Sequence, residues 1–154
     1  MKSKIIYLAS PYGFSNQWKI KLLPEFISIL ESMGAIVWDP FNRQSDNDFA
    51  NKGWAYKVAS SNFDDLKRAD AIFAILNGCP PDEGVMVELG ISIALGKPTF
   101  LFRDDFRKCT DSDEFPLNLM TFLGIPYDSW EDYYYRSINE IENPTKAIFQ
   151  WLNN

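Results

Sequence analysis

The sequence contains no histidine among its 154 residues. This absence excludes catalytic triads that join serine or cysteine to histidine, and it excludes most zinc sites, because imidazole is central to both. Any acid–base chemistry must therefore come from carboxylates, tyrosines, cysteines or lysines.

Positive charge, long apolar runs and cysteine are also scarce. The 15 Lys and Arg residues are outnumbered by 21 Asp and Glu, and the net charge of −6 argues against a nucleic-acid or anionic-membrane partner. No apolar run reaches about 18 residues, so we expect no membrane span, and the apolar start is too short for a signal peptide. Only Cys79 and Cys109 are present, which favours a reducing, cytoplasmic location over a disulfide scaffold.

Short apolar runs alternate with helical patterns along the whole chain. This alternation predicts one α/β domain over residues 1–154, with a doubly wound parallel sheet and helices on both faces. Ligands of such sheets bind at the carboxyl ends of the strands, and no G-x-G-x-x-G or Walker loop is present. The predicted strands span residues 4–10, 35–38, 71–76 and 98–102, and the predicted helices span residues 16–33, 53–68, 84–96 and 137–152. Pro24 is expected to kink the first helix or to mark its true start, and Pro144 is expected to break the last.

Glu88 is the only charged residue between Gly84 and Gly96, in a helix that is apolar on nearly every side. Burying an unpaired carboxylate is costly, so we expect the positive end of the helix to hold Glu88 ionised. Asp82 lies in the preceding loop and can face the same cavity. A pair of carboxylates is the usual catalytic pair in enzymes that break a glycosidic bond. The competing interpretation is a solvated first-turn glutamate behind a capping aspartate.

Other polar residues fall near the predicted ligand edge. Tyr7 lies near the end of the first strand, Gln44 follows the second, and Asn118 follows the fourth. Asn62 interrupts the apolar stripe of its helix, where it either reads a ligand or satisfies a local backbone group. A core tyrosine is the alternative for Tyr7. Asp64 and Asp65, away from the centre of that stripe, are expected to be solvated.

Five segments together resemble the nucleoside 2-deoxyribosyltransferase family. They span about residues 4 to 123 and read "IIYLASPYGF", "DPFNRQ", "NFDDLKRADAIFAILNGCPPDEGVMVELG", "GKPTFLF" and "PLNLM". The resemblance implies a flavodoxin-like (Rossmann-like) fold and exchange of the base of a 2′-deoxynucleoside by double displacement, without a metal or organic cofactor.

The resemblance also implies roles for individual residues. Glu88 corresponds to the nucleophile that carries the covalent glycosyl intermediate, Asp82 to the proton-handling aspartate, and Tyr7 to the tyrosine that positions the nucleophile. Gln44 corresponds to a base-contacting glutamine. Asn62 stands where several members carry a base-contacting aspartate, which leaves Asp82 as the better general acid.

In this family the sugar-binding Asn-Leu-Met segment comes from a neighbouring subunit. The resemblance therefore implies that Asn118 and Met120 complete a neighbour's site in a homo-oligomer, with a hexamer favoured and a dimer possible. The expected substrates are a 2′-deoxynucleoside and a free purine or pyrimidine base, in nucleoside salvage. Two alternatives stay open: a hydrolytic N-glycosidase acting on 2′-deoxynucleosides or deoxynucleoside 5′-monophosphates, and a non-catalytic nucleotide-binding module.

Overall fold

The computed structural model describes residues 3–44 and 52–154. Its strands form a five-stranded sheet in the order β2-β1-β3-β4-β5, and each neighbouring pair runs parallel. This is the flavodoxin-like order, so the predicted fold is confirmed. The strands are β1 (Ile5–Ala9), β2 (Ile36–Trp38), β3 (Ala71–Ile75), β4 (Thr99–Phe102) and β5 (Tyr134–Tyr135).

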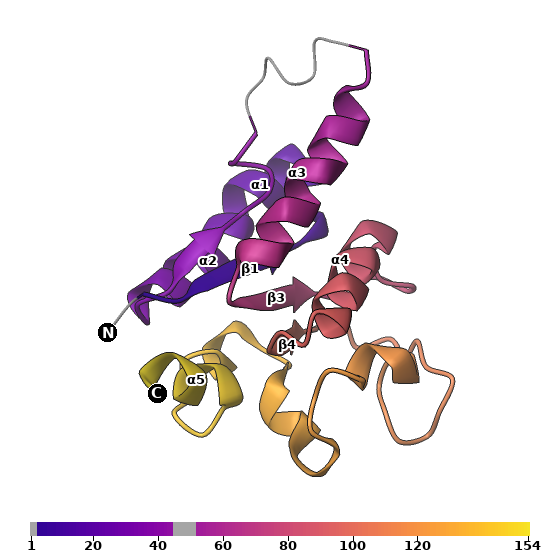
Figure 1. Ribbon diagram of the computed structural model, residues 1–154. Coiled ribbons are helices and arrows are strands. Elements are labelled where there is room, and N and C mark those ends of the chain that lie inside the picture. The colour runs from indigo at the N-terminus through magenta and orange to yellow at the C-terminus, as the bar shows by residue number, and fades with distance from the viewer. Residues whose placement is uncertain (1–2, 45–51) are drawn as a thin grey trace.

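Helices cover both faces of this sheet (Figure 1). On one face, α2 (Leu23–Ser32) and α5 (Ala147–Asn153) pack on the alternate strand residues that include Ile6 and Phe73. On the other face, α3 (Trp54–Arg68) and α4 (Glu83–Ala94) pack on the set that includes Tyr7. Because β1 and β3 are covered on both sides, they read as continuous apolar runs rather than as alternating ones.

The terminal helices need adjustment. The segment expected to be helical at 16–33 holds two helices, α1 (Asn16–Lys21) and α2, and Pro24 lies in the first turn of the second, where a missing N–H costs nothing. The segment expected at 137–152 is interrupted at Pro144, with a short 3₁₀ turn at Ile138–Glu140 before it and α5 after it. Strand β5 was missed because two residues are too few to give a pattern.

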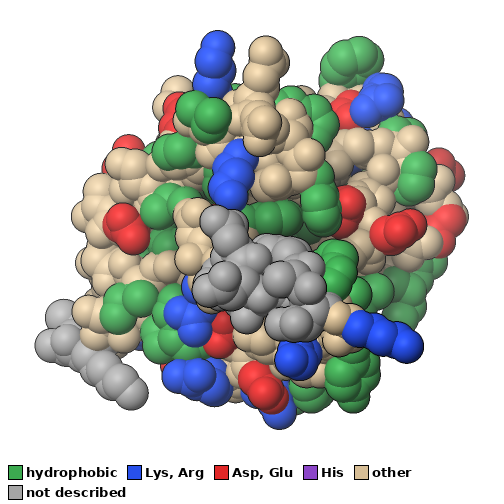
Figure 2. Space-filling view, turned by 90° about the horizontal axis from the view of Figure 1, so that it is seen from above, with side chains coloured by type: hydrophobic (Ala, Val, Ile, Leu, Met, Phe, Trp, Pro, Cys, Tyr) green, Lys and Arg blue, Asp and Glu red, His purple; other side chains and the backbone are tan. Residues whose placement is uncertain are grey.

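The prediction that the Glu88 helix is buried on nearly every side is also wrong. Val87 is 61% exposed, and Gly90 and Ala94 follow it along one open apolar face of α4. In Figure 2, hydrophobic side chains likewise reach the surface between acidic and basic ones. Within residues 3–44 and 52–154, no helix has the length and hydropathy needed to cross a membrane.

Candidate active site

A cavity of about 370 Å³ opens at the carboxyl ends of β1 and β2, between α3 and α4. This is the edge at which the parallel sheet was predicted to bind a ligand. Four of the predicted site residues line it, and they come from three separate segments of the chain. The lining residues are Ser10, Phe14, Pro40, Phe41, Gln44, Trp54, Val58, Asn62, Asp82, Gly84, Val85 and Glu88.

Tyr7 supports Glu88 from beneath. The Tyr7 hydroxyl donates a hydrogen bond of 2.6 Å to Oε1 of Glu88, and the Tyr7 side chain is fully buried in β1. Burial, together with the nearby Glu88 carboxylate, raises the pKa of Tyr7 far above its ordinary value, so the hydroxyl stays protonated and remains a donor. The interaction fixes one carboxylate oxygen.

The prediction that the helix end keeps Glu88 ionised is wrong, because the pKa of Glu88 is raised rather than lowered. Burial raises its pKa from 4.5 to about 7, although the Tyr7 hydrogen bond lowers it and the nearby Asp82 charge adds to the increase. The helix N-terminus is instead capped by Asp82, and Glu88 lies one turn further along α4. The competing interpretation of Glu88 as a solvated charge is excluded, because the carboxylate is largely buried and hydrogen-bonded.

Asp82 has a structural contact and also faces the cavity. Its Oδ1 atom accepts a hydrogen bond of 3.0 Å from the backbone N–H of Val85, which makes it the N-cap of α4. Its side chain also lines the cavity, and its charge acts on Glu88. The two carboxyl groups therefore share one site, as predicted.

Gln44 and Asn62 meet on the opposite side of the cavity. Gln44 Nε2 donates a hydrogen bond of 3.1 Å to Asn62 Oδ1, which places both amides beside the same space. The preceding residue anchors this loop, since Arg43 pairs with both oxygens of Asp65 on α3, at 2.6 and 2.9 Å. The prediction that Asp65 is solvated is wrong because this pairing keeps it only 6% exposed.

Aromatic side chains that the sequence analysis did not place at the site form one wall of the cavity. Phe14 and Phe41 pack edge to face, with ring centroids 5.1 Å apart, and Trp54 adds a third ring. Gly13 is required beneath this wall, because a Cβ atom at that position would lie 2.1 Å from the Phe41 ring. The available signal was the position of "PYGF" and "DPF" directly after two strands, at the predicted ligand edge.

Asn118 and Met120 lie outside the Glu88 cavity of their own chain. Asn118 Nδ2 donates to Asp111 at 2.7 Å, and its Oδ1 accepts from the Met120 N–H at 3.0 Å. Met120 is 58% exposed and lies against the open face of α4. The structure therefore gathers Tyr7, Asp82, Glu88, Gln44 and Asn62 around one site, and leaves these two residues apart.

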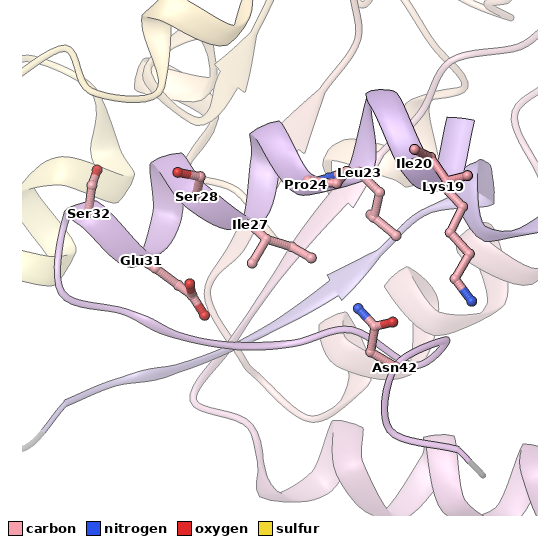
Figure 3. A pocket seen from close by; sticks show the side chains of 9 residues that line it. All are labelled: Lys19, Ile20, Leu23, Pro24, Ile27, Ser28, Glu31, Ser32 and Asn42. Atoms are coloured by element: carbon pink, nitrogen blue, oxygen red, sulfur yellow. The ribbon is translucent and has the colours of Figure 1, made fainter. Parts of the chain in front are cut away.

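A larger groove of about 760 Å³ follows α1 and α2 (Figure 3). Its charged lining side chains are Lys19 and Glu31, and Asn42 faces the helices from the loop after β2. None of the predicted site residues lines it, so the smaller cavity is the candidate site. In the described part of the chain, no group of three or more carboxylates and cysteines is placed to hold a metal ion.

Comparison with known proteins gives a consistent result. The family model for nucleoside 2-deoxyribosyltransferase matches residues 6–120. A 2-deoxyribosyltransferase from Bacillus psychrosaccharolyticus is 28% identical, with 90% of each chain covered and a TM-score of 0.68. The fold is shared with a 2-desoxiribosyltransferase from Leishmania mexicana (24% identity, 88% and 92% covered, TM-score 0.65). It is also shared with a CMP N-glycosidase from Clostridium botulinum (21% identity, 97% and 98% covered, TM-score 0.54). No curated protein matches the sequence.

Proposed function

The chain belongs to the nucleoside 2-deoxyribosyltransferase family, and on that premise we propose that it transfers a 2-deoxyribosyl group between nucleobases by double displacement through Glu88. The observation that carries this proposal is the Tyr7–Glu88 contact at the floor of a mostly apolar cavity that also holds Asp82. A buried carboxylate with one oxygen fixed and the other free to react has the arrangement required of a glycosyl nucleophile.

In the first half-reaction, ionised Glu88 attacks C1′ of the deoxynucleoside through a transition state with oxocarbenium character. The C1′–N bond breaks, its electron pair passes to the base, and Asp82 supplies the proton that lets the base leave neutral. A glycosyl ester on Glu88 remains. In the second half-reaction, a new base attacks C1′ and Glu88 departs as a carboxylate. The aromatic wall favours a base over water as the acceptor.

Gln44 and Asn62 bind the base in this proposal. Each has a carbonyl and an amino group, so together they present donors and acceptors to a base edge without adding charge. Asn62 cannot give up a proton as a carboxylic acid does, which leaves proton transfer to Asp82. The Arg43–Asp65 pair supports this function indirectly by holding the loop of Gln44 on α3.

Asn118 and Met120 enter the proposal through a second copy of the chain. Both lie outside their own Glu88 cavity, and the apolar face of α4 beside Met120 remains open, with Val87 and Leu123 61% and 66% exposed. We propose a homo-oligomer, with a hexamer favoured over a dimer, in which the 118–120 segment completes the sugar side of a neighbour's site. The proposal includes a cytoplasmic location, in keeping with the two free cysteines.

The experiment that tests the proposal is base exchange. Purified protein is mixed with 2′-deoxyinosine or 2′-deoxyuridine plus adenine, and the products are separated by chromatography. Formation of 2′-deoxyadenosine supports transfer, and mass spectrometry of the Glu88 peptide after brief exposure to substrate supports the covalent step. Release of deoxyribose and base without a new nucleoside would replace transfer by hydrolysis. Hydrolysis only of deoxynucleoside 5′-monophosphates would favour the nucleotide alternative, which the cavity lining disfavours because it includes no Lys or Arg from the described segments.

A further inference from the structure

The two cysteines come together from different loops. Cys79 lies between β3 and α4, and Cys109 lies after β4. The thiol of Cys79 donates to the backbone carbonyl of Lys108 at 3.7 Å, which places it beside the residue that precedes Cys109. Both side chains line the same cavity of about 540 Å³, on the other side of the 79–82 turn from Glu88. Because Lys108 immediately precedes Cys109 and both cysteines line this cavity, the two thiols lie on adjoining turns.

Arg103 holds the two loops in this arrangement. Its guanidinium is buried and donates to the backbone carbonyls of Leu76 and Gly78 on one side and of Arg107 on the other, at 2.6 Å to Gly78 and 2.7 Å to Arg107. The turn that carries Cys79 and the turn that carries Cys109 are therefore fixed to one side chain. The two cysteines are therefore held on adjoining turns that line one cavity.

We propose that Cys79 and Cys109 form a reversible disulfide when the protein meets a peroxide. Both thiols are free, Cys79 is exposed and Cys109 is half-buried, so Cys79 is the first to react. Its sulfur attacks the peroxide, the O–O bond breaks, water leaves and a sulfenic acid forms. The Cys109 sulfur then attacks Cys79, and the sulfenic oxygen leaves as a second water. The two electrons lost by the thiols reduce the peroxide, and a dithiol reductant reverses the reaction.

The disulfide alters the active site through Asp82, and this consequence rests on the proposed function. Bond formation draws the two sulfur atoms to about 2.05 Å from each other. Cys79 faces the cavity away from Glu88 and is three residues before Asp82, so the turn is drawn away from the nucleophile. Because a displacement of about 1 Å at a reacting group costs up to roughly a hundredfold in rate, we expect transfer to fall at least about threefold on oxidation.

The test treats the full-length protein with hydrogen peroxide and maps its peptides by mass spectrometry before and after dithiothreitol. The expected product is a single intramolecular crosslink between the Cys79 and Cys109 peptides, with loss of two hydrogens per chain and recovery by the reductant. Cys109→Ser is the matched control. It should give sulfenic and higher oxidation of Cys79 without the crosslink, and its base exchange should resist mild peroxide that slows the wild type.

Each outcome bears on one part of the proposal. Disulfide-linked dimers, or irreversible oxygen addition in place of the crosslink, would overturn the modification site, and this result needs no activity measurement. A crosslink that leaves base exchange unchanged would retain the site and overturn its effect on Asp82. Absence of base exchange in the reduced protein would count against the proposed function alone, since the crosslink is measured independently.

Discussion

The hydroxyl of Tyr7 on β1 and the carboxylate of Glu88 on α4 are joined by a hydrogen bond of 2.6 Å. This contact joins the most deeply buried part of the sheet to the cavity. The hydrogen bond orients Glu88 and lowers its pKa. Burial outweighs this effect, and the resulting pKa is about 7. Changes to either residue therefore have distinct and measurable consequences.

Replacing Glu88 by alanine should reduce base exchange below detection while the chain still folds, because Glu88 is the carboxylate that the Tyr7 hydroxyl holds by a hydrogen bond at the cavity. Initial rates of 2′-deoxyadenosine formation measure this effect, and circular dichroism checks the fold. Glu83→Ala is the matched control, since Glu83 lies exposed in the first turn of the same helix. Ordinary turnover by the Glu88 variant would rule out the assigned nucleophile.

Glu88→Gln should stabilise the protein at alkaline pH. The folded-state pKa of Glu88 is raised from 4.5 to about 7, so its contribution to stability is fully present below pH 4.5 and is lost as the pH rises through 7. At a pH above both pKa values, the loss in the free energy of unfolding amounts to about 3 kcal/mol. Urea unfolding should therefore give a variant more stable than the wild type near pH 8, with the difference disappearing below pH 4.5. A difference independent of pH would contradict the raised pKa.

Tyr7→Phe should shift the acidic limb of the pH–rate profile upward, because the hydrogen bond that lowers the pKa of Glu88 is removed. Loss of a hydrogen bond to a charged group costs about 1.5–3 kcal/mol, or roughly a tenfold to hundredfold fall in kcat near neutral pH. Tyr12→Phe is the control: Tyr12 is also buried, but its hydroxyl accepts from Asn77 instead. An unshifted limb in Tyr7→Phe would mean that the contact does not govern Glu88.

Asp82→Asn should move the same limb in the opposite direction, since the Asp82 charge raises the pKa of Glu88. Its kcat should also fall, because an amide cannot protonate the leaving base. The defect should shrink with deoxynucleosides whose bases leave readily without a proton. Equal defects for good and poor leaving bases would argue that Asp82 acts only as the helix cap seen in its bond to Val85.

A mixture of two inactive variants should recover activity if the 118–120 segment completes a neighbour's site. Glu88→Ala supplies an intact Asn118, and Asn118→Ala supplies an intact Glu88. After mild dissociation and reassembly, random pairing should restore roughly a quarter of wild-type activity, because half of the pairs are mixed and each mixed pair has one complete site. Activity no greater than the sum of the separate variants would place Asn118 outside the neighbour's site.

The sheet and its ligand edge were predictable because buried parallel strands read as short apolar runs, and four such runs alternate with helices. Glu88 was predictable because a charge in an apolar helix stands out. Its pKa was not, since the direction depends on how far burial outweighs the helix end, which is a property of the packed structure.

The loop and surface features depended on contacts that no local pattern reveals. Asp65 looks like an ordinary helix-surface aspartate until Arg43, from a different segment, folds over it. The Phe41 ring lies on Gly13 only because two strand ends meet at one edge. The open face of α4 was misjudged because an exposed apolar helix face has the same sequence pattern as a face inside a core.

Tyr7 lies on β1, between β2 and β3, with residues at 0% exposure on either side of it along the strand. The hydroxyl that orients Glu88 therefore cannot shift without disrupting the centre of the sheet. Loss of catalysis during denaturation should then coincide with the cooperative collapse of the entire domain, even when peripheral loops have already opened. Residual enzymatic rate would thus serve as an internal gauge of how much chain remains native, at concentrations too low for spectroscopy.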